Sequence, residues 1–115
     1  MRGWSIAWAL GVAMAGAFAC HPGGDVGNDG PLVGGSCRDS GDCVDRCVKG
    51  GDFPGGTCTV DCRDDGDCPE FTYCVDKEGG VCLLSCEEGE ECRGSYGCHD
   101  TDREGAGGKV HVCIH

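Results

Sequence analysis

The first pattern in the chain is an apolar N-terminal run with a basic start. Met1-Arg2-Gly3 is followed by Trp4–Phe18 without a charged residue, and Ala17-Phe18-Ala19 forms a small-x-small triplet directly before Cys20. A basic start, an apolar run and a small-residue cleavage site are the three parts of a secretory signal peptide. We therefore expect residues 1–19 to be an export signal that is removed just before Cys20.

Beyond residue 36 the hydrophobic residues are few and come in short runs between glycine-rich turns. In the middle of this region, Phe71–Val75 contains aromatic and β-branched residues, Lys77–Gly80 has the composition of a turn, and Val81–Leu84 forms a second apolar run. This order predicts a β-hairpin.

The regions on either side show the same order less clearly. Toward the N-terminus, residues 44–48 and 57–60 predict two paired strands around the glycine-rich turn 50–56. Toward the C-terminus, Lys109–Ile114 predicts a strand that is reached through the polar loop Asp100–Gly108. No stretch of useful length has helical periodicity, so we expect little or no helix in the mature chain.

The cysteines show that one unit is used three times. Residues 37–43 read CRDSGDC and residues 62–68 read CRDDGDC, which are identical at six of seven positions, and CEEGEEC at 86–92 keeps the acidic and glycine character. Repetition of this kind predicts tandem units at about 37–61, 62–85 and 86–115. Because GGSC, GGTC and GGVC end alike at Cys37, Cys58 and Cys82, the first cysteine is alternatively a remnant of an earlier unit.

Disulfides are the expected source of stability in these units. Apart from cysteine, residues 20–115 contain only 17 Val, Ile, Leu, Phe and Tyr residues, too few to offset the ordering of the chain at about 1–2 kcal/mol per residue. An oxidising compartment favours disulfides over thiolate metal sites, and the sequence has no C-x2-C pair. We expect twelve paired residues: Cys37, Cys43, Cys47, Cys58, Cys62, Cys68, Cys74, Cys82, Cys86, Cys92, Cys98 and Cys113.

Pairing within each group of four cysteines leaves 27 connectivities, from three choices in each unit. We favour first-to-third and second-to-fourth, which joins Cys62 to Cys74 and Cys68 to Cys82, because crossed links fasten the acidic loop onto the hairpin. The predicted fold is therefore small and disulfide-rich: three tandem four-cysteine β-hairpin repeats in a row, each contacting mainly its neighbours.

The segment between the export signal and the first repeat is expected to be a flexible tether. Residues 21–36 contain six Gly and two Pro and show no hydrophobic periodicity. Cys20 begins this tether, and removing it from the 13 cysteines leaves an even set of 12. An unmodified Cys20 would be an odd thiol in an oxidising compartment, so parity favours its modification.

Ala17-Phe18-Ala19-Cys20 resembles the lipobox of bacterial lipoprotein precursors, although that family prefers Leu and a small residue where this chain has Ala17 and Phe18. The resemblance implies a diacylglycerol on Cys20 and attachment to a membrane of the cell envelope. Because His21, and not Asp, follows the cysteine, it further implies the outer membrane. The alternative is simple secretion, since an ordinary signal peptidase would cut the same bond.

The middle unit, CRDDGDCPEFTYCVDKEGGVCLLSC, resembles the first part of the Dickkopf N-terminal cysteine-rich pattern. The cysteine-rich region also resembles repeat units in cysteine-rich lipoproteins of myxobacteria and their relatives, including FPGGTC in the first unit and GGVCLLSC in the middle unit. The likeness covers about residues 37–113 and implies a cysteine-rich fold and export. The signalling role of Dickkopf proteins is not carried over, because their receptor-binding residues have no match in this chain.

The charge of the chain excludes nucleic acid as a partner. The net charge is -11, and loss of the signal peptide makes it -12, since Arg2 is the single charge removed. The carboxylates in 61–67 and 87–91 invite a calcium site, yet an EF-hand loop that started at Asp61 would have Arg63 third and Thr72 twelfth, where a carboxylate is required. We expect solvated acidic loops, with a weak calcium site of another geometry as the alternative.

Two further groups of residues are candidates for a metal site or a catalytic site. His111, Cys113 and His115 alternate along the last strand and would form a zinc trio if the thiol were reduced, but that cysteine completes the third group of four. Ser85 and Ser95 lie near His99 in sequence without a nucleophile motif or a third orienting group. We therefore expect no metal site, no cofactor and no enzymatic activity.

A surface interaction or adhesion module is the function that these features favour. Phe71, Tyr73 and Tyr96 lie on the predicted hairpins and would present aromatic side chains to an unknown protein or polysaccharide partner. The alternative is a secreted protease inhibitor, whose specificity residue would be Arg46 or Arg103 on a strained, exposed loop.

Overall fold

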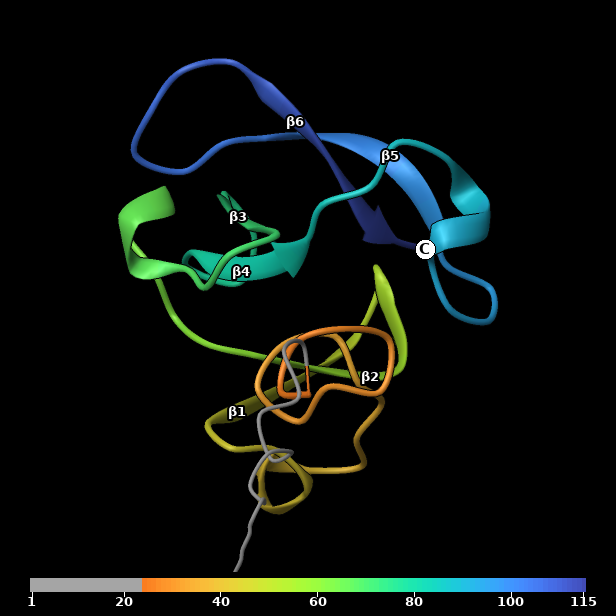
Figure 1. Cartoon of the computed structure of the whole chain (residues 1–115). Helices are drawn as coiled ribbons and strands as arrows, with labels where there is room; N and C mark the ends of the chain where they lie inside the picture. Colours follow the sequence, from red (N-terminus) through yellow and green to blue (C-terminus); the bar gives the residue numbers. More distant parts are fainter. Residues whose placement is uncertain (1–23) are drawn as a thin grey trace, which may run out of the picture.

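Three antiparallel β-hairpins form the protein. The computed structural model describes residues 24–115, so the expected signal peptide and Cys20 lie outside the described residues. Figure 1 shows the hairpins in chain order. They are β1 (Arg46–Gly50) with β2 (Phe53–Thr59), β3 (Thr72–Val75) with β4 (Val81–Leu84), and β5 (Gly97–Asp102) with β6 (Lys109–Ile114).

Helix is limited, in the described part of the chain, to one 3-10 turn before each hairpin: η1 (Ser40–Asp42), η2 (Asp65–Asp67) and η3 (Gly89–Glu91). The predicted fold class of small disulfide-rich hairpin repeats is confirmed. Within residues 24–115, no helix has both the length and the apolar character needed to cross a membrane.

The strand boundaries differ from expectation in the first and the last hairpin. In the first, the turn expected over 50–56 is wrong in most of its length, because β1 continues to Gly50 and β2 already begins at Phe53. The polar loop predicted over Asp100–Gly108 is wrong in its first part, because β5 continues to Asp102. The polar residues there contact polar side chains across the hairpin: Asp100 lies 2.6 Å from the imidazole of His111, and Asp102 forms an ion pair with Lys109. Cross-strand pairs of this kind stabilise an exposed sheet face without hydrophobic side chains.

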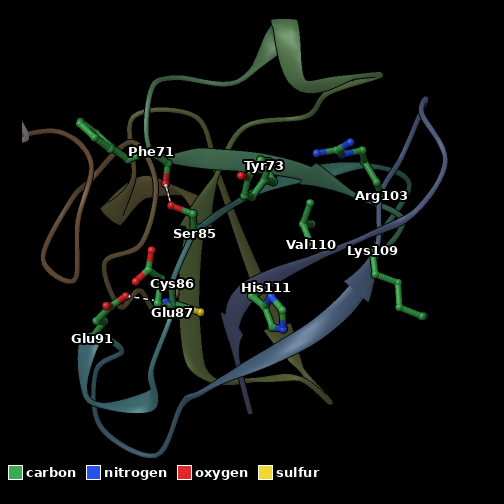
Figure 2. Close-up of a pocket in the computed structure, with 10 residues that line it drawn as sticks. All are labelled: Phe71, Tyr73, Ser85, Cys86, Glu87, Glu91, Arg103, Lys109, Val110 and His111. Carbon is green, nitrogen blue, oxygen red and sulfur yellow. Dashed lines mark hydrogen bonds between the residues drawn. The ribbon is translucent and has the colours of Figure 1, made fainter.

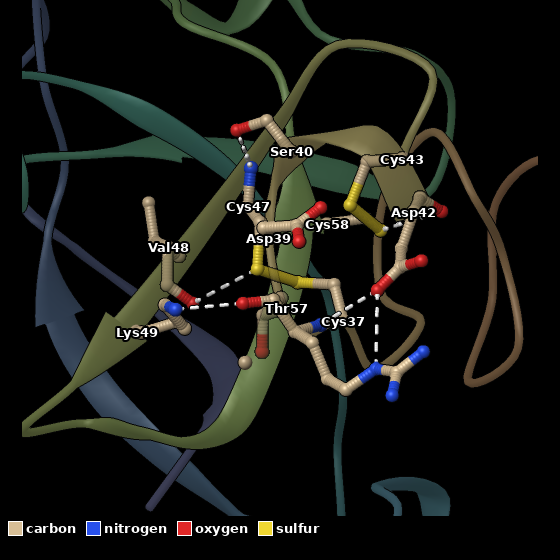
Figure 3. Close-up of a disulfide and its surroundings, with 12 residues drawn as sticks. Cys37, Asp39, Ser40, Asp42, Cys43, Cys47, Val48, Lys49, Thr57 and Cys58 are labelled. Carbon is tan, nitrogen blue, oxygen red and sulfur yellow. Dashed lines mark hydrogen bonds and ion pairs between the residues drawn. A yellow bond between two sulfur atoms is a disulfide. The ribbon is translucent and has the colours of Figure 1, made fainter.

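All six disulfides lie within units and join first to third and second to fourth cysteine, as predicted. Within each hairpin two cysteines face one another, as Cys47 and Cys58 do in the first, yet each is bonded instead to a cysteine of the acidic loop. Figure 3 shows how the two bridges fasten this loop to both strands. The pairs are Cys37–Cys47, Cys43–Cys58, Cys62–Cys74, Cys68–Cys82, Cys86–Cys98 and Cys92–Cys113.

The units share one hydrophobic core. Phe53 from the first unit, Leu83 from the second and Val112 from the third are buried in the same cluster. The third unit also contacts the first directly through Arg93 and Tyr96. The expected row, in which each unit contacts mainly its neighbours, is therefore wrong: the third unit packs against both of the others.

The segment 24–36 is folded, so the expectation of a flexible tether is wrong for these residues. Val33 is fully buried against the second unit's disulfide sulfurs. Gly34 N–H donates to the carbonyl of Cys58 at 2.9 Å, and Cys58 N–H donates to the carbonyl of Gly35 at 2.8 Å. These two hydrogen bonds join the segment to β2. Glycine is required at position 34, where φ is 112° and a Cβ would lie 2.1 Å from a backbone oxygen.

Candidate binding groove

An open groove of about 740 Å³ lies between the second and third hairpins. Figure 2 shows its walls: β3 on one side, β6 on the other, and the short connection at residues 85–87 between them. Its lining residues are Phe71, Tyr73, Ser85, Cys86, Glu87, Glu91, Arg103, Lys109, Val110 and His111.

Phe71 stands at one end of this groove in an unusual conformation. Its φ is 70°, in the left-handed region, and 75% of the residue's surface is exposed. The conformation is held by Ser85, whose N–H and hydroxyl both donate to the Phe71 carbonyl, at 2.9 and 3.0 Å. A non-glycine residue in this region costs about 1–3 kcal/mol, and such strain is concentrated at binding sites. The sequence predicted a strand from Phe71, but β3 begins one residue later.

The far end of the groove carries cations that are already paired. Lys109 Nζ lies 2.8 Å from Asp102 Oδ1. This hydrogen bond, with the attraction between the charges, lowers the pKa of Asp102 and raises that of Lys109. Arg103 Nε is 3.2 Å from Asp65 Oδ2, within ion-pair distance but outside hydrogen-bond geometry. Arg103 also lies over the ring of Tyr73, 5.4 Å from its centroid.

The end beside Phe71 is acidic and has no cation of its own. Glu87 N–H donates to Glu91 Oε1 at 2.8 Å. Within the described residues neither carboxylate forms a salt bridge. The groove therefore has separate acidic and cationic ends on a chain that is strongly acidic as a whole.

Two of the three aromatic residues expected to contact a partner lie at the groove. Phe71 is exposed and Tyr73 is half-buried in the wall, but Tyr96 is 7% exposed and packs inside the core. The expectation that Tyr96 contacts a partner is therefore wrong. Its hydroxyl donates to the carbonyl of Pro54 at 2.9 Å, which gives it a structural role.

The two arginines considered as inhibitor residues are held by ion pairs. Arg46 lies at the start of β1 and pairs with Asp61 and Glu78. Arg103 pairs with Asp65 and is half-buried. Neither side chain projects from a free loop, as the specificity residue of a protease inhibitor does.

The acidic loops use their carboxylates on their own backbone. Asp39 Oδ1 accepts the N–H of Gly41 at 2.9 Å, and Asp42 Oδ2 accepts the N–H of Arg38 at 2.8 Å. The second bond lowers the pKa of Asp42. The second unit repeats both bonds with Asp64 and Asp67. These bonds stabilise the turn that begins each unit, a role that the sequence pattern alone does not distinguish from calcium binding.

In the described part of the chain, the residues of the candidate zinc trio and of the candidate serine–histidine pair have other roles. Cys113 is bonded to Cys92, so the trio with His111 and His115 lacks a thiolate. Among residues 24–115, the groups of sulfurs close enough to hold a metal are the disulfide sulfurs themselves. Ser85 uses its hydroxyl to hold Phe71 and not to meet a histidine.

Sequence reasoning named His111 and the carboxylates in 87–91 only as candidate metal ligands, and it missed Lys109 and Val110 as groove residues. The alternation Lys109-Val110-His111 was the available signal, since it places two polar side chains on one face of a strand. No protein-family model, curated protein or solved structure matches this chain.

Proposed function

We propose that this protein is an exported, lipid-anchored interaction module that binds a partner protein in the groove between its second and third hairpins. The observation that supports this most is Phe71, an exposed aromatic side chain held in a strained backbone conformation at the groove. Exposed aromatic residues at fixed positions are typical anchors of protein interfaces. Six disulfides supply the rigidity that keeps such an anchor in place.

The proposed anchor is a lipid on Cys20. Folding of residues 24–36 against the first two units leaves a short connection between this cysteine and the domain. A domain attached in this way stays close to the membrane surface. Labelling of cells with an alkynyl fatty acid is expected to mark the wild-type protein, and Cys20→Ser is expected to abolish both the label and membrane retention. Wild-type protein that is unlabelled and free in the medium would contradict the anchor.

The groove is tested by site-specific photocrosslinking in intact cells. A photoreactive phenylalanine at position 71 is expected to give adducts with one protein partner. The matched control is position 44, because Val44 is also a large exposed hydrophobic residue, at 66%, but lies outside the groove. Equal labelling from both positions would contradict a specific groove. Adducts with polysaccharide alone would show that the partner is a glycan and that the proposed protein partner is wrong.

A further inference from the structure

The edge of β6 that faces the groove has unpaired backbone groups. Arg103 N–H donates to the carbonyl of Gly108, which sets the phase of the β5–β6 ladder. In an antiparallel pair, hydrogen-bonded and non-hydrogen-bonded positions alternate. Lys109 and His111 therefore occupy the non-hydrogen-bonded positions, and their N–H and C=O groups point away from β5.

The chain itself covers one part of this edge. Ser85 bridges Val112 in antiparallel fashion, and Cys86 N–H donates to the carbonyl of His111 at 3.2 Å. After Cys86 the chain turns away into η3 and leaves the edge. In the described residues, the N–H and C=O of Lys109 and the N–H of His111 have no hydrogen-bond partner outside the hairpin.

The uncovered edge lies along the groove, opposite β3. Figure 2 shows Lys109, Val110 and His111 along one side and Tyr73 across from them. Lys109 and His111 are exposed, while Val110 is buried. Exposed strand edges with free donors and acceptors pair readily with another extended chain.

We propose that the groove binds an extended peptide segment of the partner as an added antiparallel strand along β6 at Lys109–His111. This inference rests on the proposed function and names the form of its ligand. The segment would continue the path of residues 85–86, which already pair with β6 in this direction. Main-chain hydrogen bonds give affinity in this mode, and side chains give specificity.

The charges fix the polarity of the sequence that would bind. A strand that runs antiparallel to β6 begins near His111 and the carboxylates of Glu87 and Glu91, which form no ion pair within the described residues. It ends near Arg103 and Lys109, which are paired with Asp65 and Asp102. We infer that the segment carries a basic residue near its N-terminal end, where it would meet the carboxylates of Glu87 and Glu91. Phe71, beside the acidic end, would contact an apolar residue that precedes the strand.

The test uses peptides selected from a phage-displayed random library on the oxidised protein. In the best binder, each backbone amide is methylated in turn, which removes one N–H and leaves the side chains unchanged. Strand addition predicts loss of affinity at every second position, by about tenfold for each N–H removed, which corresponds to about 1.4 kcal/mol. Uniform small effects at all positions would overturn strand addition.

Two variants of the protein test the same hydrogen bonds from the β6 edge, at Lys109. Lys109→Pro removes an outward N–H and keeps the ladder to β5, since proline is tolerated at an edge position of this kind. Lys109→Ala removes the side chain and keeps the N–H. We expect about tenfold weaker peptide binding for Lys109→Pro and a clearly smaller loss for Lys109→Ala, which keeps the N–H. Slower hydrogen exchange of the Lys109 and His111 amides in the wild-type complex checks the same contact, whether or not the proline variant folds.

The failures of the two proposals are distinguishable. If Phe71→Ala weakens binding while the methylation scan and Lys109→Pro show no pattern, the groove binds through side chains and strand addition is wrong. If selected peptides neither protect these amides nor respond to Phe71→Ala, the groove is not the binding site and both proposals are wrong.

Discussion

The guanidinium of Arg93 lies over the ring of Tyr96, 4.4 Å from its centroid, and these two residues join the third unit to the first. Arg93 Nε donates to the carbonyl of Gly34 at 2.9 Å, and its Nη2 donates to Thr57 Oγ1 at 2.9 Å and to the carbonyl of Gly56. One side chain therefore holds both β2 and the N-terminal segment.

The hydroxyl of Tyr96 extends this connection into a chain of hydrogen bonds. It donates to the carbonyl of Pro54, and a phenol has a single hydrogen, so Thr57 must donate to Tyr96 Oη across their 2.8 Å contact. Arg93 in turn donates to Thr57. Each donor in such a chain polarises the next, which strengthens the network.

Tyr96→Phe tests this network. The substitution keeps the ring beneath Arg93 but removes the phenol, so the buried hydroxyl of Thr57 loses its acceptor. We expect the free energy of unfolding to fall by about 1–3 kcal/mol, measured by denaturant titration with the disulfides intact. Tyr73→Phe is the control, since Tyr73 is half-buried in the wall of the open groove and not inside the core. Equal effects from both would show that the network contributes nothing.

The repeat pattern predicted what recurs in every unit and missed what occurs once. The cysteine spacing gave the hairpins and the crossed disulfides, because each depends on contacts within about 20 residues. Arg93 occupies the position after the second cysteine, where the other units have Val44 and Pro69. No comparison between units reveals its contacts, which reach 36 to 59 residues back along the chain.

The same limit explains the N-terminal segment and the groove. Residues 24–36 have the composition of a tether, and their order comes from one buried side chain, Val33, and from pairing with β2. The groove depends on where residues 85–87 leave β6, which is a tertiary feature. Phe71 is exposed at the groove, but its left-handed backbone has no sequence signature, since most such positions are glycine.

Val33→Ala is expected to loosen the N-terminal segment. Val33 is fully buried against the sulfurs of the second unit, so the loss of two methyl groups and the resulting cavity should cost about 2 kcal/mol. Hydrogen exchange of the Gly34 and Cys58 amides should become faster, because their bonds join this segment to β2. Val44→Ala, at an exposed position, should change neither. Unchanged exchange in Val33→Ala would mean that the backbone pairing holds the segment without this side chain.

Gly89→Ser is expected to stabilise the third unit. In the first two units the residue at this position accepts the N–H of the third cysteine: Ser40 from Cys47 at 3.2 Å and Asp65 from Cys74 at 2.9 Å. Gly89 has no side chain to do this, and a Cβ there would meet only Cys98 N, at 4.0 Å. The serine hydroxyl should supply the missing bond, worth about 1 kcal/mol.

Gly89→Ala separates this bond from the effect of replacing glycine, which alone gives about 0.4–1 kcal/mol through the unfolded chain. The expected order of unfolding free energies is serine, then alanine, then glycine, measured by denaturant titration. If serine and alanine are equal, the hydroxyl does not reach the Cys98 amide and the third loop differs from the first two.

Folding should depend on the disulfides and not on a metal ion. The bridges span 10 to 21 residues, and in the chain-entropy account each loop of this size stabilises the fold by about 3 kcal/mol. The small shared core does not replace six such contributions, so a strong dithiol reductant is expected to collapse the dispersion of amide resonances in an NMR spectrum. Excess EDTA should leave it unchanged, because the loop carboxylates already accept backbone N–H groups.

If EDTA alone collapses the spectrum with no free thiol, calcium is structural and Asp64, Asp65 and Asp67 are its first candidate ligands. Free thiols that appear only with EDTA would instead indicate a zinc site at His111, Cys113 and His115.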